Sequence, residues 1–131
     1  ILRIMAEQIA NFRFKGYKII DSTIRISEEM EISSKLEINF EQTIGSIIEE
    51  GMYKHTLTTK ITNDNSSMNI EVKAVGFFEF DKSLSNELLQ DFFQKNAPAI
   101  LFPYVRAYIS TLTGLSGVAP LILPTLNLSK R

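Results

Sequence analysis

Apolar and polar residues alternate in four segments between residues 11 and 80. The alternation is clearest where Leu36, Ile38 and Phe40 are separated by polar residues. Side chains point to opposite faces of a strand at successive positions, so this period predicts strands with one face buried. We predict four strands, at about 11–27, 35–45, 51–62 and 68–80, with turns at Gly45–Gly51 and 63–66.

The first predicted strand keeps its period less well than the others. Phe12, Phe14, Ile20 and Ile24 share one parity, which predicts that they face the core. Gly16 interrupts that parity, as expected where a strand contains a bulge.

A helical region follows the strands. A short amphipathic helix is predicted at about 84–95, and Leu101, Val105 and Ile109 then recur at helical spacing. Because proline fits the first turn of a helix, Pro103 predicts a start near Leu101 rather than a helix through Pro98, with an end at Gly114. Residues 1–10 are compatible with another short helix.

Strands first and helices last predict an α+β fold, a four-stranded antiparallel sheet with C-terminal helices packed on one face. The 131 residues, 44% of them hydrophobic, suit a single domain spanning 1–131. Leu115 to Leu128 is apolar but aperiodic and contains two prolines, so we expect it to be a coil.

Composition and motifs argue against several classes of function. The 14 basic and 15 acidic residues indicate neither nucleic-acid binding nor an anionic membrane partner. Without cysteine and with one histidine, His55, we expect no metal, no cofactor and a structural role for His55. No catalytic motif is present, and no apolar run is long enough to insert in a membrane, so we expect a cytoplasmic protein that is not an enzyme.

The aperiodic C-terminal segment needs an apolar surface to lie on. If it covers the sheet only partly, it leaves an apolar groove beside Leu36, Ile38 and Phe40 that would bind extended peptide. If it covers the sheet fully, it is a loop that completes the core. A third reading is a carrier of a small apolar ligand that uses the same groove.

Short motifs along the chain resemble the SecB family of export chaperones. The most specific is Leu101-Phe102-Pro103-Tyr104-Val105-Arg106 at the helix start. Phe12, Phe14, Tyr17, Asp21 and Ser22 resemble the family's first strand, Glu71-Val72 with Gly76-Phe77-Phe78 its fourth, and Gly117 to Asn127 its crossover segment. The resemblance implies a holdase that acts without ATP and binds unfolded preproteins, in a groove formed here by Phe12, Phe14, Leu36, Ile38, Phe40, Leu115, Val118, Leu121, Leu123 and Leu126.

The resemblance also implies partners. It places docking of the translocase ATPase SecA at Asp21, Arg25 and Glu71, although Arg25 stands where the family has an acid, so we expect weak, salt-sensitive docking. It implies a homotetramer, a dimer of dimers, with Tyr104, Tyr108 and Thr111 at an interface. Because some SecB-like proteins serve a toxin–antitoxin system, an antitoxin is the alternative client.

Overall fold

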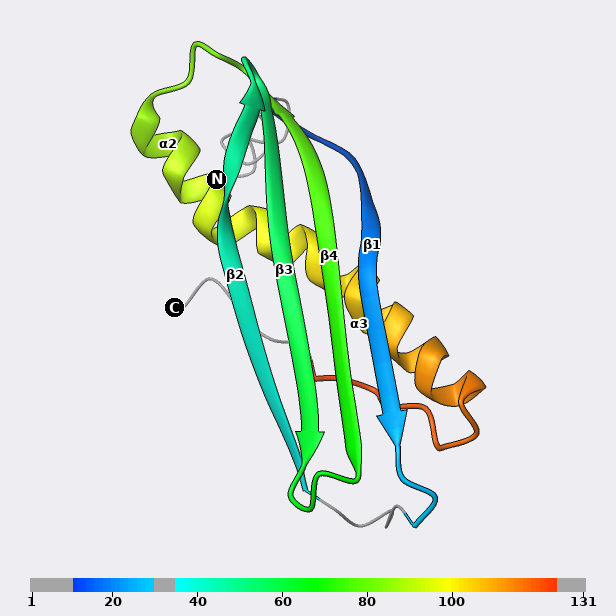
Figure 1. The fold of residues 1–131 in the computed structure, drawn as a ribbon. Helices are drawn as coiled ribbons and strands as arrows, with labels where there is room; N and C mark the ends of the chain where they lie inside the picture. Colours follow the sequence, from blue (N-terminus) through cyan, green and yellow to red (C-terminus); the bar gives the residue numbers. More distant parts are fainter. Residues whose placement is uncertain (1–10, 30–34, 125–131) are drawn as a thin grey trace.

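The computed structural model describes residues 11–29 and 35–124 and has the predicted α+β fold (Figure 1). Four antiparallel strands form one sheet in the order β1-β4-β3-β2. Their bounds are Phe12–Ile26, Leu36–Glu49, Met52–Asn63 and Met68–Phe80 for β1 to β4. The helical segments α2 (Asn86–Asp91), η1 (Phe92–Asn96) and α3 (Ala97–Leu115) lie behind one face of this sheet. The four strands are confirmed, whereas the possible helix at 1–10 lies outside the described residues.

Two strands differ from their prediction. β2 continues through Gly45 to Glu49, and its pairing with β3 shifts register between Thr43 and Ser46. The glycine therefore sits at an irregularity within the strand instead of ending it.

In β1 the register with β4 shifts twice, between Phe14 and Gly16 and between Ile19 and Asp21. The first shift reverses the parity that the sequence predicts, and the second restores it from Asp21 onward. Ile19 packs on the core, while Ile20 is 54% exposed. The prediction that Ile20 faces the core is therefore wrong, and the bulge is the reason.

The main helix begins earlier than predicted, at Ala97, and Pro98 and Pro103 both lie inside it. Ser85 caps α2 by accepting a hydrogen bond from the Leu88 N–H at 3.2 Å, and the chain then stays helical to Leu115. The π-helical turn η1 ends at Asn96, two residues before Pro98, and the Ala97 N–H donates to the Phe92 carbonyl five residues back. Because hydrogen bonds in this wider turn already depart from the α-helical pattern, the helix continues although Pro98 has no N–H to donate.

Pro103 lies inside α3, so the predicted start of this helix near Leu101 is wrong. Its missing N–H would have bonded the Ala99 carbonyl, and both residues are exposed, so water can satisfy that oxygen. The end is also one residue later than predicted, at Leu115, with Gly117 in a left-handed conformation (φ 89°) just beyond it.

The core between sheet and helices consists of two clusters. The aromatic cluster is Phe12, Tyr53, Phe78, Leu89, Phe92, Phe93 and Ala97. The aliphatic cluster is Phe40, Leu57, Ile61, Met68, Ile70, Val72, Ala74, Leu101, Phe102, Val105, Ile109 and Leu123. At Gly76 a Cβ atom would stand 3.2 Å from the Phe78 ring and 3.4 Å from a Leu101 methyl group, so the absence of a side chain relieves a tight contact with the Phe78 ring.

Candidate functional site

The candidate site lies where a coil, and not a helix, covers the sheet. The coil is residues 116–124, here called the crossover segment, which returns from the end of α3 beneath the sheet (Figure 1). Its Leu123 is 1% exposed within the aliphatic cluster, and Leu121 packs against that cluster from its edge. The crossover segment therefore supplies part of the hydrophobic core.

Beyond the hydrogen bonds that Ser116 and Gly117 make to the last turn of α3, Leu121 and Pro120 also fix the crossover segment on this helix. The Leu121 N–H donates to the Thr113 hydroxyl oxygen at 2.8 Å. That fully buried hydroxyl in turn donates within α3, where the Ile109 carbonyl lies 2.9 Å away. Pro120 folds over Gly114, where a Cβ would meet the proline ring at 3.2 Å. A side chain at 114 would push the crossover segment away from the helix.

The sheet side of the candidate site comes from β2. Its inward residues become progressively less covered towards the start of the strand, because Phe40 is 9% exposed, Ile38 is half-buried and Leu36 is 41% exposed. Phe40 meets the ring of Phe102 edge to face at 5.3 Å. We call Leu36, Ile38, Phe40, Leu121 and Leu123 the apolar strip.

Other predicted groove residues lie elsewhere. Phe12 is buried in the aromatic cluster, stacked on Phe92 at 3.7 Å, and Phe14 packs on that cluster from its edge. Leu115 is 84% exposed at the end of α3, and Val118 is half-buried. Leu126 lies outside the described residues. Of the predicted groove residues that the structure describes, it brings together Ile38, Phe40, Leu121 and Leu123 in one cluster, with Leu36 next to Ile38 along the same face of β2.

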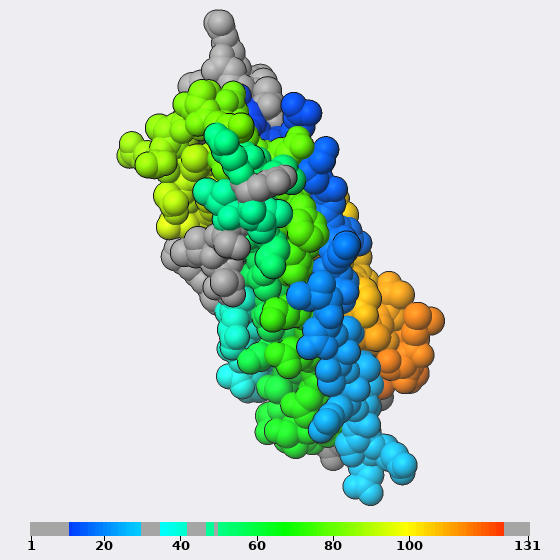
Figure 2. All heavy atoms as spheres, turned by 45° about the horizontal axis from the view of Figure 1, so that its top comes forward, coloured from blue at the N-terminus to red at the C-terminus, as the bar shows by residue number. Residues whose placement is uncertain are grey.

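The predicted docking residues lie on the outer face of the sheet, the face away from the helices, whose strands run side by side in Figure 2. All three of Asp21, Arg25 and Glu71 are exposed. Glu71 is 3.8 Å from the Lys60 ammonium, which also donates to Glu41 at 3.0 Å. That hydrogen bond raises the pKa of Lys60 above its usual value. One of the two predicted docking acids is thus already paired.

The predicted interface residues lie along α3. Tyr104 is 39% exposed and stacks on Tyr17 of β1, with ring centroids 4.5 Å apart. Tyr108 is half-buried and donates a hydrogen bond to Ser22 at 2.9 Å, and Thr111 is exposed. Tyr17, which the sequence analysis did not assign to an interface, therefore belongs to the same surface.

His55, the histidine for which the sequence analysis expects a structural role, lies in the core. Its side chain is fully buried on β3, and its Nδ1 lies 2.8 Å from the Tyr53 hydroxyl. Burial lowers the pKa of His55 to about 4, so the ring is neutral at neutral pH. The described residues contain no cluster of acids and histidine that could hold a metal ion.

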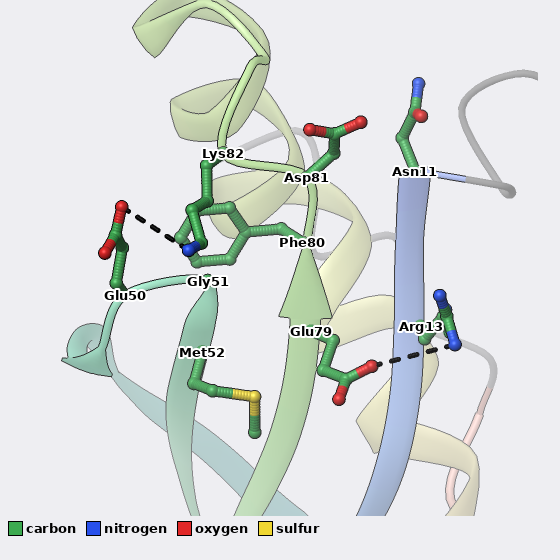
Figure 3. Close-up of a pocket in the computed structure, with 9 residues that line it drawn as sticks. All are labelled: Asn11, Arg13, Glu50, Gly51, Met52, Glu79, Phe80, Asp81 and Lys82. Atoms are coloured by element: carbon green, nitrogen blue, oxygen red, sulfur yellow. Dashed lines mark ion pairs between the residues drawn. The ribbon is translucent and has the colours of Figure 1, made fainter.

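A polar pocket of about 440 Å3 opens on the outer face, at the end of the sheet where β2 turns into β3 (Figure 3). Its walls carry two ion pairs, Glu50 with Lys82 at 3.5 Å and Arg13 with Glu79 at 3.9 Å. All four side chains are substantially exposed, so these pairs are screened by water and weak. The pocket is separate from the apolar strip.

Comparison with known proteins identifies relatives. The model of the family SecB, described as preprotein translocase subunit SecB, matches residues 20–130. The protein-export protein SecB of Orientia tsutsugamushi (strain Boryong) is 30% identical over 125 residues, covering 93% of this chain and 75% of the relative. An uncharacterized protein of Methanocaldococcus jannaschii is 33% identical over 109 residues, covering 83% of this chain and 66% of that protein.

A solved structure has the same fold. The SecB-like chaperone Rv1957 of Mycobacterium tuberculosis, in complex with a ChAD peptide from the antitoxin HigA1, superposes with a TM-score of 0.73. The match covers 95% of this chain and 94% of that chain at 15% identity. In the described part of the present chain, no helix has the length and apolar character needed to cross a membrane.

Proposed function

Because this chain belongs to the SecB family, we propose that it is a cytoplasmic holdase of one domain, spanning 1–131, that binds unfolded polypeptides without ATP. The family consists of chaperones, not enzymes. The observation that carries the proposal is the apolar strip, where the core is covered by a coil held through a few contacts and Leu36 stays 41% exposed. An extended client segment would bury apolar area there, at about 25 cal/mol per Å2 before the cost of ordering the client.

Suppression of aggregation tests the holdase. Purified protein in several-fold excess should keep a chemically unfolded client soluble without ATP, measured by light scattering. Leu36→Asp and Ile38→Asp should weaken suppression while circular dichroism stays unchanged, because a carboxylate in the strip opposes apolar burial. Leu88→Asp is a matched control, since Leu88 is exposed to a similar extent, 43%, on α2. No suppression by the wild type, or equal loss in all three variants, would contradict the proposal.

Preproteins destined for export are the clients we propose first, because curated relatives at 30% identity are named protein-export proteins. SecA docking at Asp21 and Glu71 would then be weak and salt-sensitive, because Arg25 and Lys60 oppose a basic partner. Those same two cations favour a second candidate function, a chaperone dedicated to one antitoxin, which needs no acidic docking face.

A pull-down from the native cell with mass spectrometry separates the two candidates. Recovery of many unfolded precursors with SecA, increased by Arg25→Glu, would support export. Recovery of one small antitoxin, unaffected by that substitution, would support the second candidate. In the same experiment, Lys95→Glu changes charge equally on the helical side of the chain and serves as the control.

We also propose a homotetramer built as a dimer of dimers. The exposed residues of α3 carry no charge, although a solvated helix face normally does; they are Ala99, Pro103, Tyr104, Ala107, Thr111, Gly114 and Leu115. Tyr17 adds an exposed ring beside Tyr104. Sedimentation at micromolar concentration should give the tetramer, and Ala107→Glu should dissociate it. A monomeric wild type would contradict this proposal without affecting the holdase test.

A further inference from the structure

The outer face of the sheet has a buried apolar residue at its centre. Val75 is 3% exposed, although it points away from the helical layer. Its register partners are Lys18 of β1 and Thr56 of β3, and Lys73 and Phe77 are the next residues on the same face of β4. Lysine side chains lay their carbon stems over apolar neighbours and keep the ammonium group in water. Val75 is therefore covered by surrounding side chains that present charge outward.

Three cations lie around Val75 on this face. Lys18 and Lys73 are diagonal neighbours across β1 and β4, and Lys54 is diagonal to Val75 on β3. Among the described residues, none of the three makes an ion pair or a side-chain hydrogen bond. We call Lys18, Lys54 and Lys73 the cationic patch.

Most of the acidic side chains described on this face form ion pairs with cations outside the cationic patch. Glu79 lies 3.9 Å from both Arg13 and Lys15, and Lys60 takes Glu41 and Glu71. Asp21 stands opposite Lys73 in the register, yet no ion pair joins them within the described residues. Among the side chains that the structure describes, the three ammonium groups of the cationic patch thus face one unpaired carboxylate, that of Asp21, so the local excess of charge is positive.

We propose that the cationic patch docks an extended acidic peptide segment of a partner protein. Every second side chain of an extended peptide lies about 7 Å from the last, which is close to the spacing of diagonal neighbours such as Lys18 and Lys73, about 7–8 Å. Two alternating carboxylates would therefore meet the ammonium groups of Lys18 and Lys73, while Lys54 lies farther away, on the other side of β4. Phe77, half-buried beside Val75 and paired with Lys54 in the register, offers apolar contact.

The arrangement of charge favours a peptide over a nucleic acid. A phosphate backbone carries negative charge without interruption, and Glu71 and Glu79 flank the cationic patch along β4, where they would repel it. The net charge of −1 for the whole chain also opposes polyanion binding at longer range. A peptide, by contrast, can carry its acidic side chains at just those positions that meet the lysines and uncharged side chains elsewhere. This docking surface goes beyond the proposed holdase and is opposite in sign to a site for a basic partner.

Binding of defined peptides tests the cationic patch. The probe is a short labelled peptide in which Glu alternates with Ala, followed by fluorescence anisotropy at low and physiological salt. Lys18→Glu and Lys73→Glu should each weaken binding about fivefold or more at low salt, and added salt should weaken wild-type binding. Lys95→Glu, which changes charge equally on η1, should leave binding unchanged. Asp21→Asn should strengthen binding, whereas it would weaken docking of a basic partner.

Three outcomes would overturn this proposal. They are equal binding of a peptide with Lys in place of Glu, tighter binding of a short single-stranded RNA, and equal loss in the control and the patch variants. Suppression of client aggregation is measured on the same proteins. Because the cationic patch and the apolar strip lie on opposite faces of the sheet, the patch variants should keep suppression, so failure of either proposal is recognised separately.

Discussion

The two ends of the core are closed in different ways. At one end, α2 and η1 cover the sheet, and flat rings stack on one another, with Tyr53 on Phe93 at 3.6 Å and Phe12 on Phe92 at 3.7 Å. At the other end, α3 covers only part of the sheet, and the crossover segment covers more of it through Leu123. A helix satisfies its own backbone hydrogen bonds, whereas a coil depends on groups such as the Thr113 hydroxyl.

This difference is the physical basis of the client site that we propose. Opening the aromatic cluster would separate stacked rings and a hydrogen-bonded helix at once. Opening the crossover segment would expose apolar surface at the cost of few polar contacts. His55 lies between Tyr53 and Leu57 on β3, and therefore at the boundary between the two ends.

The largest effect is expected at the aromatic cluster. Phe93→Ala should reduce the free energy of unfolding by about 3–5 kcal/mol, because a buried ring stacked on Tyr53 is replaced by a cavity. Denaturant unfolding measures it, with exposed Leu88→Ala as the control expected to change stability by less than about 1 kcal/mol. A loss smaller than that of Leu123→Ala would reverse the comparison.

Leu123→Ala should cost less, about 2–3 kcal/mol, because the coil around it can partly collapse into the space left behind. Its neighbour Ile122 is 73% exposed, so Ile122→Ala should cost less than about 0.5 kcal/mol. The same unfolding measurement checks both variants. Equal losses at the two positions would show that the crossover segment does not pack in solution as described.

Acid should weaken the fold through His55 at the boundary. Its folded pKa of about 4 lies below the ordinary value of 6.5, so the unfolded chain binds the proton more readily. This contribution to stability is complete above about pH 6.5 and is lost as pH falls towards 4, which amounts to about 2 kcal/mol between pH 7 and pH 5. Unfolding at both pH values should show this loss in the wild type. If His55→Leu shows the same loss, the histidine is not responsible.

The smallest effect is expected from Thr113→Val, about 1–2 kcal/mol. This change keeps the volume but removes the acceptor of the Leu121 N–H, so the crossover segment loses a polar contact without losing apolar area. The exposed Thr111 provides the matched control, Thr111→Val, with little expected change. Faster hydrogen exchange at Leu121 would confirm that Thr113 holds the coil, and unchanged exchange would argue against it.

The parts of this fold that follow from local patterns were predictable. Alternation located the four strands, and the buried row Tyr53, His55, Leu57 and Ile61 matches it residue by residue. The prediction was wrong at two positions where an irregular turn or bulge changes the local pattern. The wide turn η1 lets the helix continue through Pro98, and a bulge in β1 turns Ile20 outward. In a segment without periodicity, the sequence does not indicate which side chains face the core, so the burial of Leu123 was not predictable.

The ion pairs around the predicted SecA-docking residues were not predictable from the sequence, because they depend on the register of the strands. Lys60 reaches acids on two neighbouring strands, and only the alignment of β2, β3 and β4 brings the three together. The residue types that resemble the family's docking site are visible in the sequence, but their pairing is not. For the same reason the cationic patch combines lysines from three different strands and forms no motif along the chain.

The strand order also determines the order in which the strands can pair during synthesis. β1 is the first strand to leave the ribosome, but its partner β4 is the last, whereas β2, β3 and β4 pair with their neighbours in sequence. The meander of β2 to β4 can therefore form from local contacts, and β1 must wait for a distant one. Until β4 has been synthesised, β1 has no strand to pair with, and Ile19 and Ile24 cannot be buried against the completed core. The nascent chain thus presents, for that interval, the same kind of segment that a holdase binds.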